Sequence, residues 1–428
     1  MILKFLTSTF RSLKSMTVGL LGFLFVSPIA KLCPRRKNRI VVIGGYGGEF
    51  SDNCKYFFLQ SIQLYKELEI FFLTDIEAVH DSLLNARAPV IFYPSLKSFF
   101  YLLTSSLVIV DNNQWLTGFK RFMLQGARSI QLWHGVGFKR IELDKLENES
   151  RNRPWLQNSK VKKIRRLTRI LSGRSITYDL VISTSEFYEE KVFKKAMRGK
   201  NFLIAGYPRN TFGADLMNSD TLWCGVDCNL YRQCLAWKDE GKKIVLVMPT
   251  FRDSQKIPVF LSEDILKRIN CFCEDFGLEM IFKFHPNETN VNTVCGSHLH
   301  VMKRGSDIYP FIPISQALVT DYSSVYMDYT LVNSPILFFV PDFDDFSKND
   351  RQIQFDYHAM TPGPKLENWD DVMLALKNLE SNDLWQSQRE SISRLAFDKK
   401  DQSKATTEIL NFAIENNWIS FEVINERK

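Results

Sequence analysis

The sequence predicts an α/β protein made of two Rossmann-like lobes. At 428 residues the chain exceeds the roughly 250 to 300 residues at which a single hydrophobic core stops growing, so two domains are expected. Short apolar runs rich in Val, Ile and Phe alternate with longer amphipathic stretches, which is typical of repeated βα units and a parallel sheet. A hydrophobic fraction of 45% and a charged fraction of 24% exclude both a polytopic membrane protein and extensive disorder.

The expected strands fall into two series. The first comprises residues 40–44, 68–74, 89–93, 106–110, 130–133 and 180–183. The second comprises residues 244–248, 279–284, 299–302, 317–320 and 336–340. A polar stretch without strand character separates them over residues 210–239. Ligands of doubly wound folds bind beyond the carboxyl ends of strands, so the cleft between the lobes is the expected site.

The domain boundaries follow from these two series. We expect a basic and apolar membrane-association segment over residues 1–38 and an N-terminal lobe over residues 39–205. A linker region is expected over residues 206–240, a C-terminal lobe over 241–390 and C-terminal helices over 391–428.

The positive charge of the chain is concentrated at its N-terminus. Residues 1–48 carry eight basic side chains and no acidic one, so this segment holds +8 and the rest of the chain sums to −1, against a formal net charge of +7. The basic residues are Lys4, Arg11, Lys14, Lys31, Arg35, Arg36, Lys37 and Arg39. This distribution indicates a local anionic partner such as a membrane surface and argues against a nucleic-acid-binding body.

Residues 15–30 between these basic groups carry no charge and are largely apolar. They are shorter than the roughly 20 residues that span a bilayer, and they contain Gly19, Gly22 and Pro28. A signal peptide is disfavoured because no clear cleavage site follows and residues 35–37 are basic. We expect a helix lying in the headgroup region of an anionic cytosolic leaflet, and a helix buried in the first domain is the alternative.

A second basic amphipathic helix is expected over residues 160–169, where six basic residues surround apolar residues at intervals of three. Such a helix suits a membrane surface or a polyanionic acceptor. A solvated helix packed on its own domain explains the pattern equally well.

Two histidines follow expected strands directly. His134 ends an apolar run and precedes Gly135, and His285 is followed by Pro286, which ends the strand. A histidine at a strand's carboxyl end lies where an α/β fold binds its ligands, and its near-neutral pKa suits a general base. A single such histidine would more often be structural, whereas one in each lobe favours catalysis.

Two more strand ends carry groups suited to phosphate. Thr250 offers a hydroxyl and Arg252 a bidentate cation. Asp321, Ser323 and Ser324 follow an apolar run and can cap the next helix, so that hydroxyl and N–H groups face an anion. The glycines of residues 44–48 lack the spacing of a dinucleotide or P-loop site. The eight cysteines show no paired CxxC spacing, so we expect reduced thiols and no metal.

These segments occur in a specific order along the chain. They lie at residues 47–56, 132–141, 206–210, 249–253, 283–286, 320–324, 335–342 and 362–364. In this combination, over about residues 40 to 365, the chain resembles the CDP-glycerol glycerophosphotransferase family of teichoic-acid and capsule polymer synthesis. It departs from the family pattern at residues 136–138, where Thr-Pro-Leu is common, and at Thr211 and Gln316, where Asp is common. These departures bear on donor and acceptor identity.

The resemblance implies a GT-B-type fold, chemistry without a metal or other cofactor, and peripheral attachment to the cytoplasmic face of a bacterial cell membrane. It also implies that His134 and His285 are the essential pair. The expected reaction transfers glycerol phosphate or a related polyol phosphate from a CDP-activated donor to a hydroxyl of a lipid-linked or polymeric acceptor, releasing CMP.

The site roles follow from this reaction. We expect His134 to act as the base on the acceptor side, and His285 to stabilise the departing pyrophosphate oxygens together with Arg252, Thr250, Ser323 and Ser324. Asp321 is expected to orient its loop. Further residues expected on the acceptor side are Gly135, Lys139, Asp52, Asn53 and Arg209.

Two other functions stay open. A nucleotide-sugar glycosyltransferase of the same fold would use a similar cleft. A non-catalytic membrane adaptor would explain the basic segments but not the ordered polar strand ends. The sequence also leaves open glycerol or ribitol as the polyol, and a single addition or polymerisation.

Overall fold

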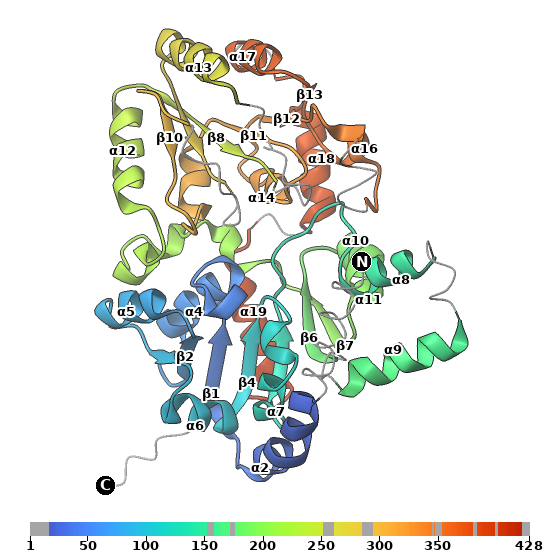
Figure 1. Ribbon diagram of the computed structural model, residues 1–428. Helices are drawn as coiled ribbons and strands as arrows, with labels where there is room; N and C mark the ends of the chain where they lie inside the picture. Colours follow the sequence, from blue (N-terminus) through green and yellow to red (C-terminus); the bar gives the residue numbers. More distant parts are fainter. Residues whose placement is uncertain are drawn as a thin grey trace. The chain divides into compact units, whose positions relative to one another are not determined.

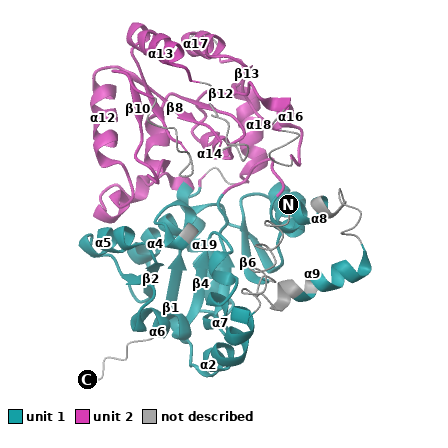
Figure 2. Ribbon diagram, in the orientation of Figure 1, with its two compact units in different colours: residues 1–134, 141–209, 402–428 teal, residues 135–140, 210–401 magenta. Residues whose placement is uncertain are grey.

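The computed structural model describes residues 17–151, 158–171, 176–250, 261–284, 294–344, 346, 353–379, 383–398 and 401–421. The chain forms two compact units (Figure 2). Unit 1 contains residues 1–134, 141–209 and 402–428, and unit 2 contains residues 135–140 and 210–401. Each unit is built around one parallel sheet (Figure 1).

The sheet of unit 1 has seven strands in the order β3-β2-β1-β4-β5-β6-β7. The strands are β1 (Arg36–Ile43), β2 (Glu69–Thr74), β3 (Val90–Phe92), β4 (Ser105–Val110), β5 (Arg128–Gln131), β6 (Tyr178–Ser183) and β7 (Gly199–Ile204). All neighbours are parallel, and Ile40 of β1 pairs with Ile70 of β2 and Leu107 of β4. The order reverses between β1 and β4, which is the switch point where Rossmann-type sheets bind ligands.

Helices connect these strands and cover the sheet, so that residues 40–43 of β1 are fully buried. The α-helices of unit 1 are α2 (Ser27–Leu32), α3 (Gly45–Gly48), α4 (Asp52–Leu64), α5 (Glu77–Asn85), α6 (Leu96–Thr104), α7 (Lys120–Met123), α8 (Glu142–Arg151), α9 (Ser159–Leu171), α10 (Glu186–Tyr188), α11 (Lys194–Ala196) and α19 (Ala405–Glu415). Short π- and 3₁₀-helical segments are η1 (Gly22–Val26), η2 (Gln114–Leu116), η4 (Glu189–Phe193) and, at the boundary with unit 2, η5 (Pro208–Thr211).

The C-terminal part of the chain returns to unit 1. Helix α19 packs against α4, where Thr406 donates a hydrogen bond to Gln60, and Ser420 N donates to the carbonyl of Lys37 at 3.0 Å. The C-terminal helices expected over residues 391–428 are divided between the units, since α18 (Gln386–Ala396) lies in unit 2 and α19 in unit 1.

The sheet of unit 2 has six parallel strands in the order β10-β9-β8-β11-β12-β13, which repeats the order of unit 1. The strands are β8 (Lys243–Met248), β9 (Leu278–Phe282), β10 (Leu299–Val301), β11 (Ala317–Thr320), β12 (Ile336–Phe339) and β13 (Lys365–Leu366). The switch point lies between β8 and β11. All eleven expected strands are therefore found, and β7 and β13 were missed.

The helices of unit 2 complete a doubly wound lobe, with α13 and α17 side by side (Figure 1). They are η6 (Ala214–Leu216), η7 (Asp220–Trp223), α12 (Cys228–Asp239), α13 (Glu263–Phe276), η9 (Tyr309–Ile314), α14 (Val325–Tyr329), α16 (Tyr357–Met360), α17 (Trp369–Asn378) and α18. Helix α12 lies in the stretch expected to link the lobes, and the two units divide at residues 209 and 210.

The N-terminal helix packs on unit 1 through small residues. Residues 17–32 are helical, and Gly19, Gly22, Ser27 and Ala30 are buried on one side. A Cβ added at Gly22 would meet the ring of Phe122 at 2.4 Å, so only glycine allows this approach. The opposite side exposes large apolar side chains.

Arg35 holds this helix to the sheet. Its guanidinium donates to carbonyls of Leu102, Ser105, Ala30 and Met123 at 2.7 to 3.3 Å, and to that of Gln125. Burial lowers the pKa of Arg35 to about 10. This basic residue therefore serves the fold and is not available to an external anion.

Arg39 likewise serves the fold, because it is buried and pairs with Glu69 at 2.6 Å. Lys31, Arg36 and Lys37 are exposed, and Lys4, Arg11 and Lys14 lie outside the described residues. The positive charge that residues 1–48 present to solvent is thus smaller than the +8 counted from the sequence.

A buried carboxylate near the start of β9 braces unit 2. Glu279 accepts hydrogen bonds from His298, His300 and Lys242 at 3.1, 2.7 and 2.9 Å. Burial disfavours the charged carboxylate, but the bonds from His300, Lys242 and His298 outweigh it and hold the pKa of Glu279 below its ordinary value.

Candidate active site

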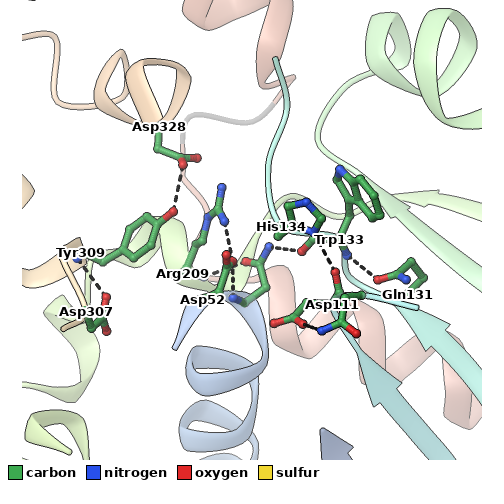
Figure 3. Close-up of polar contacts among 11 residues, drawn as sticks. Asp52, Asp111, Gln131, Trp133, His134, Arg209, Asp307, Tyr309 and Asp328 are labelled. Atoms are coloured by element: carbon green, nitrogen blue, oxygen red, sulfur yellow. Dashed lines mark hydrogen bonds and ion pairs between the residues drawn. The ribbon is translucent and has the colours of Figure 1, made fainter. Parts of the chain in front are cut away.

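The first group of site residues lies at the switch point of unit 1. His134 follows β5, Asp111 follows β4 directly, and Asp52 begins α4 beyond the end of β1 (Figure 3). Asn53 is the next residue of α4. Because the carboxyl ends of parallel strands share one edge of the sheet, residues distant in sequence meet here.

The exposed imidazole of His134 is oriented by the backbone. Its Nδ1 lies 3.1 Å from the carbonyl oxygen of Asp111, and the indole of Trp133 lies over the ring with centroids 4.0 Å apart. A carbonyl can only accept, so Nδ1 carries the proton. In the neutral imidazole Nε2 then has the free lone pair, which is the state a general base requires.

The turn that presents His134 is strained and held by side chains. Trp133 has a φ of +61°, a left-handed conformation that costs a non-glycine residue about 1 to 2 kcal/mol. Its N–H donates to Oε1 of Gln131 at 2.9 Å (Figure 3). Its carbonyl accepts from Nδ2 of Asn53 at 2.8 Å. β5 ends at Gln131, two residues before the expected end, and the left-handed Trp133 cannot continue a strand.

Asp52 and Arg209 form a partly buried ion pair beside this turn. Arg209 is 2% exposed, Asn53 has no exposed surface, and Asp52 keeps 28% of its side chain exposed. The N–H of Arg209 also donates to Oδ1 of Asn53 at 3.3 Å. Three residues expected on the acceptor side thus lie together and are joined by hydrogen bonds.

Asp111 was not predicted from the sequence. Its carboxyl is buried, and burial first and the Asp52 carboxylate second raise its pKa well above the ordinary value. Burial, and then Asp111, also raise the pKa of the Cys54 thiol. Asp111 follows an apolar strand as His134 does, so the same strand-end signal could have found it.

The second group lies at the switch point of unit 2. Both carboxylate oxygens of Asp321 accept from the N–H of Thr250, at 2.9 and 3.0 Å, and the Asp321 carbonyl accepts from the hydroxyl of Tyr357 at 3.0 Å. Asp321 therefore joins the loop after β8 to the loop after β11. Ser323 and Ser324 follow, are half-buried, and precede α14.

The segment after His134 belongs to unit 2. Phe138 is 1% exposed and packs against Tyr326 and Tyr357, with ring centroids 6.2 and 5.2 Å away. A Cβ at Gly137 would approach Ser324 Cβ to 3.2 Å, and Lys139 Nζ lies 5.6 Å from the ring of Phe346. Gly135, with a φ of +140°, starts this segment.

His285 and Arg252 lie outside the described residues, so their geometry stays a prediction. Within the described ranges, no group of three or more His, Cys, Asp or Glu side chains is arranged to hold a metal ion. Nor does any helix in those ranges have the length and apolarity to cross a membrane.

Comparison with known proteins decides the family. Residues 26–415 match the family described as CDP-glycerol:poly(glycerophosphate) glycerophosphotransferase. The chain belongs to this family. The glycerophosphotransferase identity and enzyme class predicted from the ordered motifs are confirmed.

The names of similar proteins agree with this family assignment. A teichoic acid poly(glycerol phosphate) polymerase of Bacillus spizizenii is 26% identical over 89% of this chain and 94% of its own length. The enzyme of the same name from Bacillus subtilis is 28% identical over 59% of this chain, and that match spans only 33% of the relative.

A solved structure of the wall teichoic acid polymerase TagF has a TM-score of 0.67 at 20% identity, covering 96% of this chain and 97% of that one. At this identity the likeness concerns the fold. The predicted class, α/β with two Rossmann-like lobes of GT-B type, is confirmed for this glycerophosphotransferase.

Proposed function

We propose that this glycerophosphotransferase transfers glycerol phosphate from CDP-glycerol to a hydroxyl of a membrane-linked acceptor in teichoic-acid-like or capsule polymer synthesis, releasing CMP. The family match over residues 26–415 carries the proposal. The geometry of His134, whose Nε2 is left as the free base, supports it.

His134 acts on the acceptor. Its Nε2 takes the proton of the acceptor hydroxyl, whose oxygen attacks the phosphorus that bears glycerol. The bond from that phosphorus to the bridging oxygen breaks, and CMP leaves with the oxygen and its electrons. A positioned base contributes about 10² to 10⁴ in rate, because the hydroxyl is otherwise protonated at neutral pH.

Unit 2 acts on the donor. Thr250, Ser323 and Ser324 lie at its switch point, where they can donate hydrogen bonds to the phosphate oxygens as charge develops on the departing CMP. Asp321 orders this loop by holding the Thr250 N–H. His285 and Arg252 are assigned to the same role from the sequence motifs alone.

We place the enzyme peripherally at the cytoplasmic face of the membrane. The N-terminal helix exposes Leu21, Phe23, Leu24, Phe25 and Ile29 by 48 to 65%. Lys31 and Lys37 beside it are also exposed, and this combination suits an anionic leaflet.

The basic helix α9 supports the same location. It exposes Ile164 and Leu167 by 64% and 57%, next to the exposed Lys160, Lys162 and Lys163. An amphipathic helix with lysines around an exposed apolar side has the chemistry of an interfacial segment.

The function is tested by measuring CMP release from purified protein supplied with membrane acceptor and CDP-glycerol, CDP-ribitol or UDP-sugars. We expect CDP-glycerol to be used, and His134→Ala and His285→Ala each to lower CMP release by about 10² to 10⁴. His80→Ala is the matched control, because His80 lies on α5 of unit 1 and pairs with Asp81.

Near-normal CMP release by a folded His134→Ala protein would contradict the role of the base. Nucleotide release from a UDP-sugar alone would instead identify a glycosyltransferase.

A further inference from the structure

We propose that Asn53 is a positioning residue: it holds the peptide before His134 so that the imidazole keeps Nε2 as its free base. The proposal deepens the function given above and rests on His134 being the base. Asn53 does not touch substrate in this role; it acts through the turn.

Asn53 connects three segments that are distant in the sequence. It is the second residue of α4 and has no exposed surface. Its Nδ2 donates to the Trp133 carbonyl at 2.8 Å, and its Oδ1 accepts from the Arg209 N–H at 3.3 Å. Since the side chain is wholly enclosed, it meets the chain and not an acceptor.

The bond to Trp133 fixes the peptide that carries His134. Trp133 is left-handed at a φ of +61°, and such strain persists only where the surroundings enforce it. Gln131 holds the N–H of Trp133 (Figure 3), and Asn53 holds its carbonyl. Without Asn53 this peptide can rotate, and the imidazole moves with it.

The orientation of the ring decides which nitrogen is the base. Nδ1–H donates to the Asp111 carbonyl over 3.1 Å, so a modest rotation removes that acceptor. The proton then also populates Nε2, and the fraction of imidazole in the competent tautomer falls. A displacement of about 1 Å at the reacting atom can itself cost about 100-fold in rate.

The Asp52–Arg209 pair keeps Asn53 in place. Arg209 is enclosed and its charge is neutralised by Asp52, whose own φ is +58°. The Asn53 N–H donates to Oδ1 of Asp52 at 2.6 Å. The amide side chain is therefore fixed from both sides, as a positioning residue requires.

Gln60 offers a matched control. It lies seven residues along α4, is 2% exposed, and donates from Nε2 to the Pro208 carbonyl at 3.3 Å while accepting from Thr406. Gln60→Leu removes buried amide bonds from the same helix to the same 208–209 turn, but leaves Trp133 untouched.

The experiment compares Asn53→Leu, Asn53→Asp and Gln60→Leu in the full chain. Asn53→Asp keeps the shape and the acceptor for Arg209 N–H, but places an oxygen against the Trp133 carbonyl. We expect both Asn53 variants to lower kcat about 30- to 100-fold with KM for CDP-glycerol within twofold. Gln60→Leu is expected to keep kcat within threefold of wild type, even if its Tm falls as much as the Tm of the Asn53 variants.

NMR of protein labelled in its histidine rings gives a readout independent of activity. The His134 signals, assigned by their loss in His134→Gln, are expected to show the Nδ1–H tautomer in wild type and Gln60→Leu, and a mixture of tautomers in the Asn53 variants. If the wild-type protein releases no CMP from CDP-glycerol, the proposed function fails, while this NMR comparison still decides the role of Asn53.

Two results would overturn the proposal. One is an Asn53→Asp protein with unchanged His134 tautomer. The other is a fall in kcat for Gln60→Leu equal to that of the Asn53 variants, which would show a general loss of stability. If Asn53→Leu does not fold, Asn53→Asp decides both points.

Discussion

The exposed side of the N-terminal helix leads to a quantitative prediction about membrane binding. Replacing Leu21, Leu24 and Phe25 by Gln removes three large apolar groups and keeps good helix formers. These residues expose 48%, 52% and 65% of their surface, so the change leaves the packed side with its glycines intact. Phe23 is kept because its ring packs against Phe122.

The magnitude follows from the exposed area. Complete burial of such a side chain gives about 1.5 to 3 kcal/mol, and about half of each is still exposed, so the three together contribute roughly 2.5 to 5 kcal/mol in acyl chains. At 1.4 kcal/mol per factor of ten, the triple variant should bind vesicles at least about 50-fold more weakly.

The assay is cosedimentation of the full chain with vesicles of phosphatidylglycerol and phosphatidylethanolamine, at low and high salt. A control protein with Leu84, Leu96 and Leu384 changed to Gln removes three leucines that are 57 to 90% exposed elsewhere. It should bind as the wild type does. If the helix variant binds within twofold of wild type, or the control loses as much, the apolar side of this helix does not dock on lipid.

Two further predictions concern unit 2. Asp321→Asn should raise KM for CDP-glycerol about tenfold and keep kcat within threefold, because one of the two bonds to the Thr250 N–H is lost. Steady-state CMP release over a range of donor concentrations measures both constants. An unchanged KM would contradict the loop-ordering role of Asp321. Glu279→Gln should lower the free energy of unfolding at pH 7 by about 2 to 3 kcal/mol, since it leaves His298 and His300 without their carboxylate. The pKa of Glu279 is held low in the folded state, so its contribution is present above the unfolded value of about 4.3 and disappears as pH falls through the folded value. Urea unfolding should therefore show the free energies of unfolding of the variant and the wild type approaching each other as pH falls below about 4.3, and a constant gap would refute this.

The fold followed from the sequence because parallel strands buried on both faces are apolar throughout. Every strand with such a run was found. β7 begins with Gly199, Lys200 and Asn201, has only three apolar residues after them and remains half exposed, and β13 has only two residues, so neither carries an apolar run along its whole length. Strand ends near His134 were less predictable, because the left-handed Trp133 is a product of tertiary contacts.

The site residues could be predicted from position, but their partners could not. His134, Thr250 and Asp321 each follow an apolar strand. The hydrogen bonds that hold these loops join residues far apart in the sequence. Asn53 and Trp133, for example, are 80 positions apart, and no local pattern encodes such a pair. The burial of charged side chains was equally unpredictable. Arg35 and Arg39 were counted among the basic residues facing an anionic partner, but their guanidinium groups bond within unit 1.

The return of residues 402–421 to unit 1 has a consequence for biosynthesis. Unit 2 is nearly continuous in sequence and can complete its core while the chain is still being made. Unit 1 lacks the helix that covers α4 until α19 has been translated, so this lobe begins before unit 2 and is completed after it. A ribosome-bound intermediate would therefore expose the surface of α4 around Gln60, and a truncation that removes α19 would damage the lobe that carries His134.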